Sequence, residues 1–224
     1  MSNHAYASFW CKDYSAATML ERFGRFLETV PFSASDPGFT QLLIRAVSPA
    51  EVPLVEHDLR SVPLSAAEII ALAQEHLHPD CVYETRAHWD LWTYEPTSGR
   101  WQMRQQPLDI YCCGEDYDDG AWRESGHLQA EIGFEHLFTG HAGLLGARAP
   151  RVPTAQHPVE QAFLERMIRP ENFSEYHEKT RENIRALLHW MTKIEAAVPI
   201  ERSRLWSEGE ENFEARMEEI LAVR

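Results

Sequence analysis

Two stretches of the chain share the same local sequence, Ser15-Ala16-Ala17 and Ser65-Ala66-Ala67. Each stretch opens an amphipathic run, and each follows a short apolar segment with the composition of a β-strand. Serine is a favoured N-cap residue, so Ser15 and Ser65 are predicted to begin two equivalent helices. The repeated pattern therefore predicts the order strand, helix, strand, twice over.

The segments around these helices complete the predicted sheet. Alternating or continuous apolar residues predict six strands, at residues 6–11, 39–47, 52–59, 81–94, 101–113 and 128–136. Pro107 falls within the fifth of these, which predicts a bulge or an edge position there. The order of elements is typical of a ferredoxin-like, split βαβ domain. We predict an α+β fold in which residues 1–140 form this domain and an antiparallel hairpin extends its sheet.

The remainder of the chain has a different pattern. Glycines and prolines are concentrated in residues 141–157, which predicts a linker, and residues 158–224 have helical periodicity. The apolar faces of these helices need a partner. The two earlier helices would cover one face of the sheet, and the other face would carry aromatic residues such as Tyr6, Trp10, Trp92 and Tyr94. We predict that the C-terminal helical segment packs on that second face.

Composition excludes several classes of protein. The net charge is −14, and residues 1–140 contain 21 acidic against 9 basic residues, so nucleic acid would be repelled. No apolar run approaches the roughly 20 residues that span a bilayer, and the N-terminus lacks the pattern of a secretory signal. Four cysteines are too few for a disulfide scaffold, and reduced thiols are expected. These features predict a cytoplasmic protein without a membrane or nucleic-acid partner.

The loop at residues 115–120 concentrates negative charge. Glu115, Asp116, Asp118 and Asp119 lie within five positions. The spacing does not fit a calcium-binding EF-hand, because His127 stands where the closing glutamate should be. Such a loop is suited to a basic protein surface, since opposite charge accelerates association.

Two groups of residues could carry metal chemistry. His88, Asp90, His127 and Glu131 fall on neighbouring predicted strands and would form a site if their side chains converged, although a solvated sheet face has the same composition. His76, His78 and Asp80 resemble part of the ligand motif of metallo-β-lactamase-like hydrolases, but Cys81 replaces the last histidine of that motif. The helix end that precedes them explains the two histidines without a metal. No metal and no cofactor are predicted.

No nucleophile elbow, phosphate loop or dinucleotide fingerprint occurs in the chain. The sequence therefore favours a binding or regulatory protein over an enzyme, one that engages another protein through its acidic α+β domain. One alternative is a metal-assisted hydrolase that uses His88, Asp90, His127 and Glu131. Another is a small-molecule binder with an aromatic cleft between sheet and tail, lined by Trp89, Trp92 and Trp101.

Overall fold

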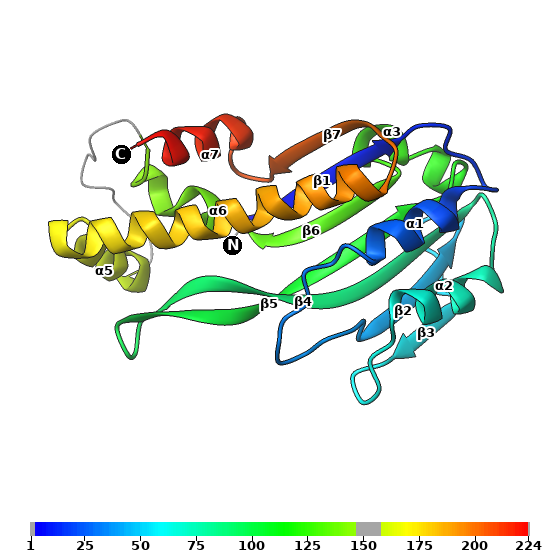
Figure 1. Cartoon of the computed structure of the whole chain (residues 1–224), viewed down its shortest axis with the longest axis horizontal. Coiled ribbons are helices and arrows are strands. Elements are labelled where there is room, and N and C mark those ends of the chain that lie inside the picture. Colours follow the sequence, from blue (N-terminus) through cyan, green and yellow to red (C-terminus); the bar gives the residue numbers. More distant parts are fainter. Residues whose placement is uncertain (1–2, 147–157, 224) are drawn as a thin grey trace.

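The computed structural model describes residues 3–146 and 158–223, and one antiparallel sheet of seven strands runs through them (Figure 1). The strands lie in the order β3-β2-β4-β5-β6-β1-β7. Their bounds are His4–Cys11 for β1, Gln41–Ala46 for β2, Val55–Asp58 for β3, Cys81–Glu95 for β4, Arg100–Cys113 for β5, Leu128–Phe134 for β6 and Ile200–Ser207 for β7. The predicted α+β class and the antiparallel β4–β5 hairpin are confirmed.

The strand order corrects the ferredoxin-like prediction. One predicted crossover unit is present, because α2 connects β3 to β4, which flank β2 in the sheet. The other is not, since α1 carries the chain from β1 over β4, β5 and β6 to β2. β1 pairs with β6 and β7 and therefore has neither β3 nor β4 as a neighbour. The local order of elements was thus predicted correctly, whereas the pairing of β1 was not.

The helices that cover the sheet lie on one face. Their bounds and those of the short connecting helices are Met19–Leu27 for α1, Ala66–Gln74 for α2, Trp122–Ser125 for α3, His136–Thr139 for α4, Pro158–Met167 for α5, Pro170–Ala197 for α6 and Phe213–Ala222 for α7. In β4 the alternate residues Tyr83, Thr85, Ala87, Trp89 and Leu91 are buried, as the period of two predicts. The facing side chains come from α1, α2 and α6.

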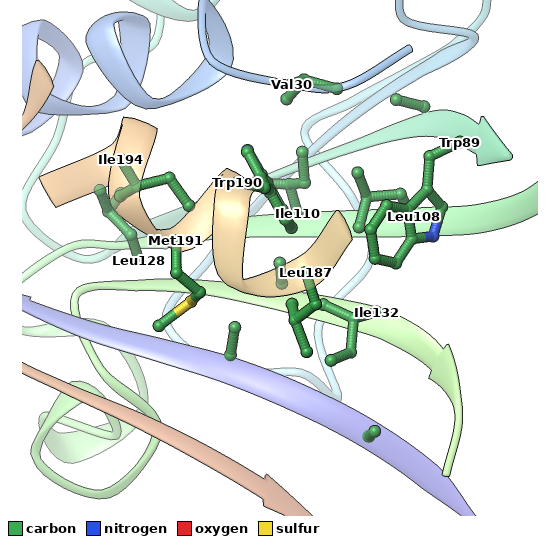
Figure 2. Close-up of a cluster of buried hydrophobic side chains, with 14 of the residues drawn as sticks. Val30, Trp89, Leu108, Ile110, Leu128, Ile132, Leu187, Trp190, Met191 and Ile194 are labelled. Carbon is green, nitrogen blue, oxygen red and sulfur yellow. The ribbon is translucent and has the colours of Figure 1, made fainter. Parts of the chain in front are cut away.

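The centre of the core lies between α6 and the sheet. Figure 2 shows Leu187, Trp190, Met191 and Ile194 of α6 beside Leu108, Ile110, Leu128 and Ile132 of β5 and β6. The Trp190 ring lies 5.8 Å from the rings of both Phe26 in α1 and Trp89 in β4. Because α6 shares the face of α1, the prediction that the tail packs on the opposite face is wrong.

The opposite face is covered at one end by the loop between β5 and β6. There Val82, Cys113 and Tyr117 form a small buried cluster, and the Trp10 indole donates a hydrogen bond to the backbone oxygen of Trp122. Elsewhere this face carries cross-strand ion pairs, such as Arg45 with Glu84 and Arg86 with Asp109. Paired charges of this kind suit a surface in contact with water.

The segment predicted to be wholly helical also supplies a strand. β7 pairs with β1 along its length, from Ser207 opposite Ala5 to Ile200 opposite Cys11. The three predicted helices of the segment are present as α5, α6 and α7. Residues 141–146 of the predicted linker contain a 3₁₀ turn, His141–Gly143, and residues 147–157 lie outside the described part of the chain. No helix within the described ranges is long and apolar enough to cross a membrane.

The two serines predicted to be N-caps differ in the structure. Ser65 caps α2 in a capping box, in which its hydroxyl faces the Glu68 amide and the Glu68 carboxylate accepts from the Ser65 amide at 2.8 Å. Ser15 instead begins a turn, and α1 starts at Met19 after Thr18. The equivalence of the two caps is therefore not observed.

We expect Ser65→Ala to lower the free energy of unfolding by about 1 kcal/mol, because the capping box is lost. Ser15→Ala is the matched control and should cost less than about 0.5 kcal/mol, since its hydroxyl caps no helix. Urea unfolding of both variants measures the difference. Equal losses would contradict the assignment of the cap.

Candidate binding site

A pocket of about 830 Å³ lies where the tip of the β4–β5 hairpin meets α4, α5 and α6. Figure 1 shows this corner, with the hairpin tip close to α5 and the first turns of α6. A volume of this order is typical of sites for small organic molecules. The lining combines aromatic rings with a few polar groups, which is the usual composition of such sites.

One wall of the pocket is a cluster of four rings. Tyr94 and Trp101 lie directly opposite each other in the β4–β5 register, with ring centroids 5.5 Å apart. Tyr176 of α6 stacks on Trp101 at 5.5 Å, and Phe163 of α5 meets Tyr94 edge-on at 5.3 Å. Contacts of this geometry stabilise aromatic clusters beyond their buried area. The hairpin and the two helices therefore form a joint aromatic surface.

A second wall consists of two stacked histidines. His136 in α4 and His141 in the following turn have ring centroids 4.1 Å apart. Gly140 makes this possible, because its φ of 76° turns the chain back. A Cβ there would lie 2.9 Å from Leu145 and from the Tyr176 hydroxyl. The same hydroxyl accepts a hydrogen bond from the His141 amide at 2.6 Å, which fixes the turn.

Burial determines the charge of these imidazoles. It lowers the pKa of His136 to about 3, with a smaller contribution from His141, and lowers the pKa of His141 to about 4. Both rings are therefore neutral at pH 7. Glu160 lies nearby, with 3.9 Å between its Oε1 and His141 Nδ1, and Glu135 also lines the pocket.

One polar group of the pocket has no partner among the described residues. The Tyr94 hydroxyl is buried, yet no donor or acceptor in residues 3–146 and 158–223 reaches it. By contrast, Asn183 is fully used: its side chain accepts from the Trp92 amide and donates to the backbone oxygens of Trp92 and Leu137. Asn183 thus joins the hairpin to α4, whereas the Tyr94 hydroxyl is left without a partner in the described part of the chain.

The residues predicted for a hydrolase site have separate partners. His88 faces Asp36, with 2.8 Å between Nδ1 and Oδ2, and Asp90 accepts from Ser33 at 2.8 Å. His127 is buried and accepts the amide of Cys11 through Nδ1 at 2.9 Å. Glu131 is bonded to His4. No contact joins any two of His88, Asp90, His127 and Glu131 within the part of the chain that the structure describes, so the hydrolase hypothesis stays a prediction without geometric support.

The other predicted metal residues follow the end of α2. His78 Nδ1 lies 2.6 Å from Asp80 Oδ1, while the backbone oxygen of His76 accepts the Tyr83 hydroxyl at 2.9 Å. Across the described ranges, no group of three or more His, Cys, Asp or Glu side chains has the arrangement of a metal site. All four cysteines are free and buried, and burial raises the pKa of Cys11 and Cys113 to about 12.

The acidic loop has a defined conformation. The Glu115 carboxylate accepts the Ala16 amide at 3.1 Å, and the Asp118 amide donates to the backbone of Val47 at 2.8 Å. Asp116, Asp118 and Asp119 are exposed. Within this loop Tyr117–Asp119 form a 3₁₀ turn, and α3 follows it.

The predicted aromatic residues divide into two groups. Trp92 and Trp101 line the pocket, whereas Trp89 is only 2% exposed and belongs to the core beside Trp190. Sequence reasoning missed His136, His141 and Tyr176 as site residues. His136 and His141 lie on either side of Gly140, and a glycine there is a sequence signal for a turn that can bring the two histidines together. The sequence does not show which other segments of the chain face this turn.

Comparison of the chain with protein-family models, with curated protein sequences and with solved structures gave no match.

Proposed function

We propose that the protein binds a small organic molecule in the aromatic pocket between the β4–β5 hairpin and the helices α4, α5 and α6. The observation that carries this proposal is the pocket itself, about 830 Å³ in volume and lined by aromatic rings, among them Tyr94, whose hydroxyl is buried without a partner among the described residues. An unsatisfied buried hydroxyl costs free energy, and a ligand or a water molecule that reached it would recover part of that cost. The volume and the aromatic lining support the same conclusion.

The protonation state of the histidines favours binding over acid–base catalysis. An efficient general base has a pKa near the working pH. The pKa values of His136 and His141, about 3 and about 4, are far below neutrality because both rings are buried. Neutral stacked imidazoles instead supply flat surface and hydrogen-bonding nitrogens. The two histidines therefore support a binding role for this pocket.

The experiment uses indole as a neutral aromatic probe and ligand-observed NMR as the measurement. We expect the full-length protein to bind indole with a Kd on the order of 1 mM, as befits a ligand of about ten heavy atoms. Trp101→Ala should weaken binding about tenfold, because one face of the wall is lost. Trp206→Ala is the matched control, since Trp206 is similarly half-exposed but stacks on Tyr6, away from the pocket.

Two outcomes would contradict the proposal. One is the absence of indole binding to the folded protein, and the other is equal loss of binding in Trp101→Ala and Trp206→Ala. Tyr94→Phe gives a further check, because it removes only the unpartnered hydroxyl. This variant should unfold at no lower urea concentration than the parent chain.

A second candidate function is association with a basic protein through the acidic loop. One observation favours it: Asp116, Asp118 and Asp119 are exposed, and none of them forms an ion pair with another described residue. Salt-sensitive capture of a basic partner, abolished by charge reversal in the loop, would support it.

A further inference from the structure

The side chains that line the pocket include more acidic than basic groups. Two carboxylates contribute to the lining, Glu135 and Glu160, against one cationic side chain, Arg104. Arg104 is already paired with Glu95 on the neighbouring strand. Glu135 accepts a backbone amide, that of Gly209, at 3.1 Å, and Glu160 faces the neutral ring of His141. Among the described lining residues, the two carboxylates therefore have no cationic partner, and the nearby cations Lys179 and Arg166 contact lining rings without belonging to the lining themselves.

The aromatic rings also favour a positively charged ligand. The face of an aromatic ring carries negative electrostatic potential and attracts cations. Two rings of the hairpin tip already show such contacts: the Lys179 ammonium lies 3.6 Å from the centroid of Trp92, and the Arg166 guanidinium lies 5.6 Å from that of Tyr94. Clustered rings with nearby carboxylates are the usual means by which proteins hold alkylated ammonium groups.

We propose that the ligand of this pocket is an organic cation, an amine or a quaternary ammonium compound, held by the aromatic walls and by Glu160 and Glu135. The inference rests on the proposed function and names the ligand's chemical class. An anionic ligand would meet the two carboxylates without an unpaired cation in the described lining. A neutral ligand would use the rings but leave the carboxylates without a role in binding.

The test compares two probes of the same shape, phenyltrimethylammonium and its neutral isostere tert-butylbenzene, in which carbon replaces nitrogen. Both are titrated into the full-length protein at concentrations below the solubility of the neutral compound. We expect the cation to bind about tenfold more tightly than the isostere, in the range of desolvated cation–π contacts. Added salt should weaken only the binding of the cation.

Three glutamate variants test whether the preference for a cation arises from the carboxylates of the pocket. Glu160→Gln and Glu135→Gln should each weaken the binding of the cation about threefold and leave that of tert-butylbenzene unchanged. Glu165→Gln is the control, because Glu165 is exposed on the same helix as Glu160 but does not line the pocket. It should bind both probes as the parent protein does.

The possible results separate the two proposals. Binding of the neutral probe at equal or higher affinity than the cation would overturn the inference and leave the proposed function intact. Tighter binding of benzoate than of phenyltrimethylammonium would also overturn it. If neither indole nor any of these probes bound the folded protein, the proposed function itself would fail.

Discussion

Replacing Trp190 by alanine is expected to lower the free energy of unfolding by about 3 to 5 kcal/mol, the largest effect of any single substitution considered for this chain. Trp190 is only 1% exposed and lies at the point where α1, α6 and the sheet meet. Its ring contacts those of Phe26 and Trp89, and its indole N–H donates to the Thr29 hydroxyl at 3.0 Å. Alanine would leave a cavity that three separate elements cannot close.

Urea unfolding followed by circular dichroism measures this loss. Trp190→Phe keeps much of the ring and should fall between the parent chain and the alanine variant. Leu188→Ala is the matched control on α6, because Leu188 is 39% exposed, and it should cost less than about 1 kcal/mol. If Trp190→Ala unfolded cooperatively within about 1 kcal/mol of the parent, the placement of α6 on this face would be wrong.

The position of Trp190 also shows what the sequence could not predict about the fold. The spacing of Ile184, Leu187, Met191 and Ile194 indicates a helix with one apolar face, and α6 confirms it. The same spacing does not say which face of the sheet that helix covers. Tyr6 and Trp10 suggested the wrong face, because a partly exposed aromatic residue such as Tyr6, or one buried under a loop such as Trp10, has the same alternation as residues beneath a helix.

Strand pairing was the second feature of the fold that the sequence predicted only in part. The strand β7 has the sequence Ile-Glu-Arg-Ser-Arg-Leu-Trp-Ser, in which five of the eight residues are polar or charged. Within the described sheet it lies at an edge and pairs with β1, so a buried Leu205 and a partly buried Ile200 are sufficient to attach it to the core. A bulge or an edge position was predicted at Pro107, and the structure shows the second: β4 pairs with β5 through Pro107 without a register shift, whereas β6 pairs with β5 from Asp109 to Cys112.

The candidate site was predictable only in part. Trp92 and Trp101 were expected to line a cleft between sheet and tail, and they line the pocket. Tyr94 and the stacked histidines line one pocket because segments far apart in the chain lie together there. Phe163 and Tyr176 complete the wall from helices about seventy residues downstream of the hairpin, and no local pattern encodes that approach.

Acid is expected to destabilise the protein through its buried histidines, and His127 shows the effect most clearly. Its side chain is almost fully buried, stacked on Tyr14 at 4.0 Å, and its Nδ1 accepts the amide of Cys11 at 2.9 Å. Burial lowers the pKa of His127 to about 4, against an ordinary value near 6.5. Protonation would place charge in this apolar site and remove the acceptor for the Cys11 amide.

The direction of the pH dependence follows from proton binding in the folded and unfolded states. Between pH about 6.5 and about 4, the unfolded chain binds a proton at His127 that the folded chain does not, so stability falls as the pH falls through this range. Above pH about 6.5 the contribution of His127 is fully present. At about 1.4 kcal/mol for each pH unit, the loss approaches roughly 3 kcal/mol. His136 and His141 add in the same direction, because burial lowers the pKa of each.

His127→Asn isolates this contribution, because the asparagine side chain can place an acceptor near the position of Nδ1 but does not titrate. We expect this variant to be less stable than the parent at neutral pH, since the stacking on Tyr14 is lost, and to lose less stability on acidification. His189→Asn, the same substitution at an exposed position of α6, is the matched control. Urea unfolding from neutral pH to about pH 4 measures all three proteins. Parallel pH profiles for His127→Asn and the parent would show that folding does not lower the pKa of His127, which would contradict the effect of its burial beside Tyr14 and Trp122.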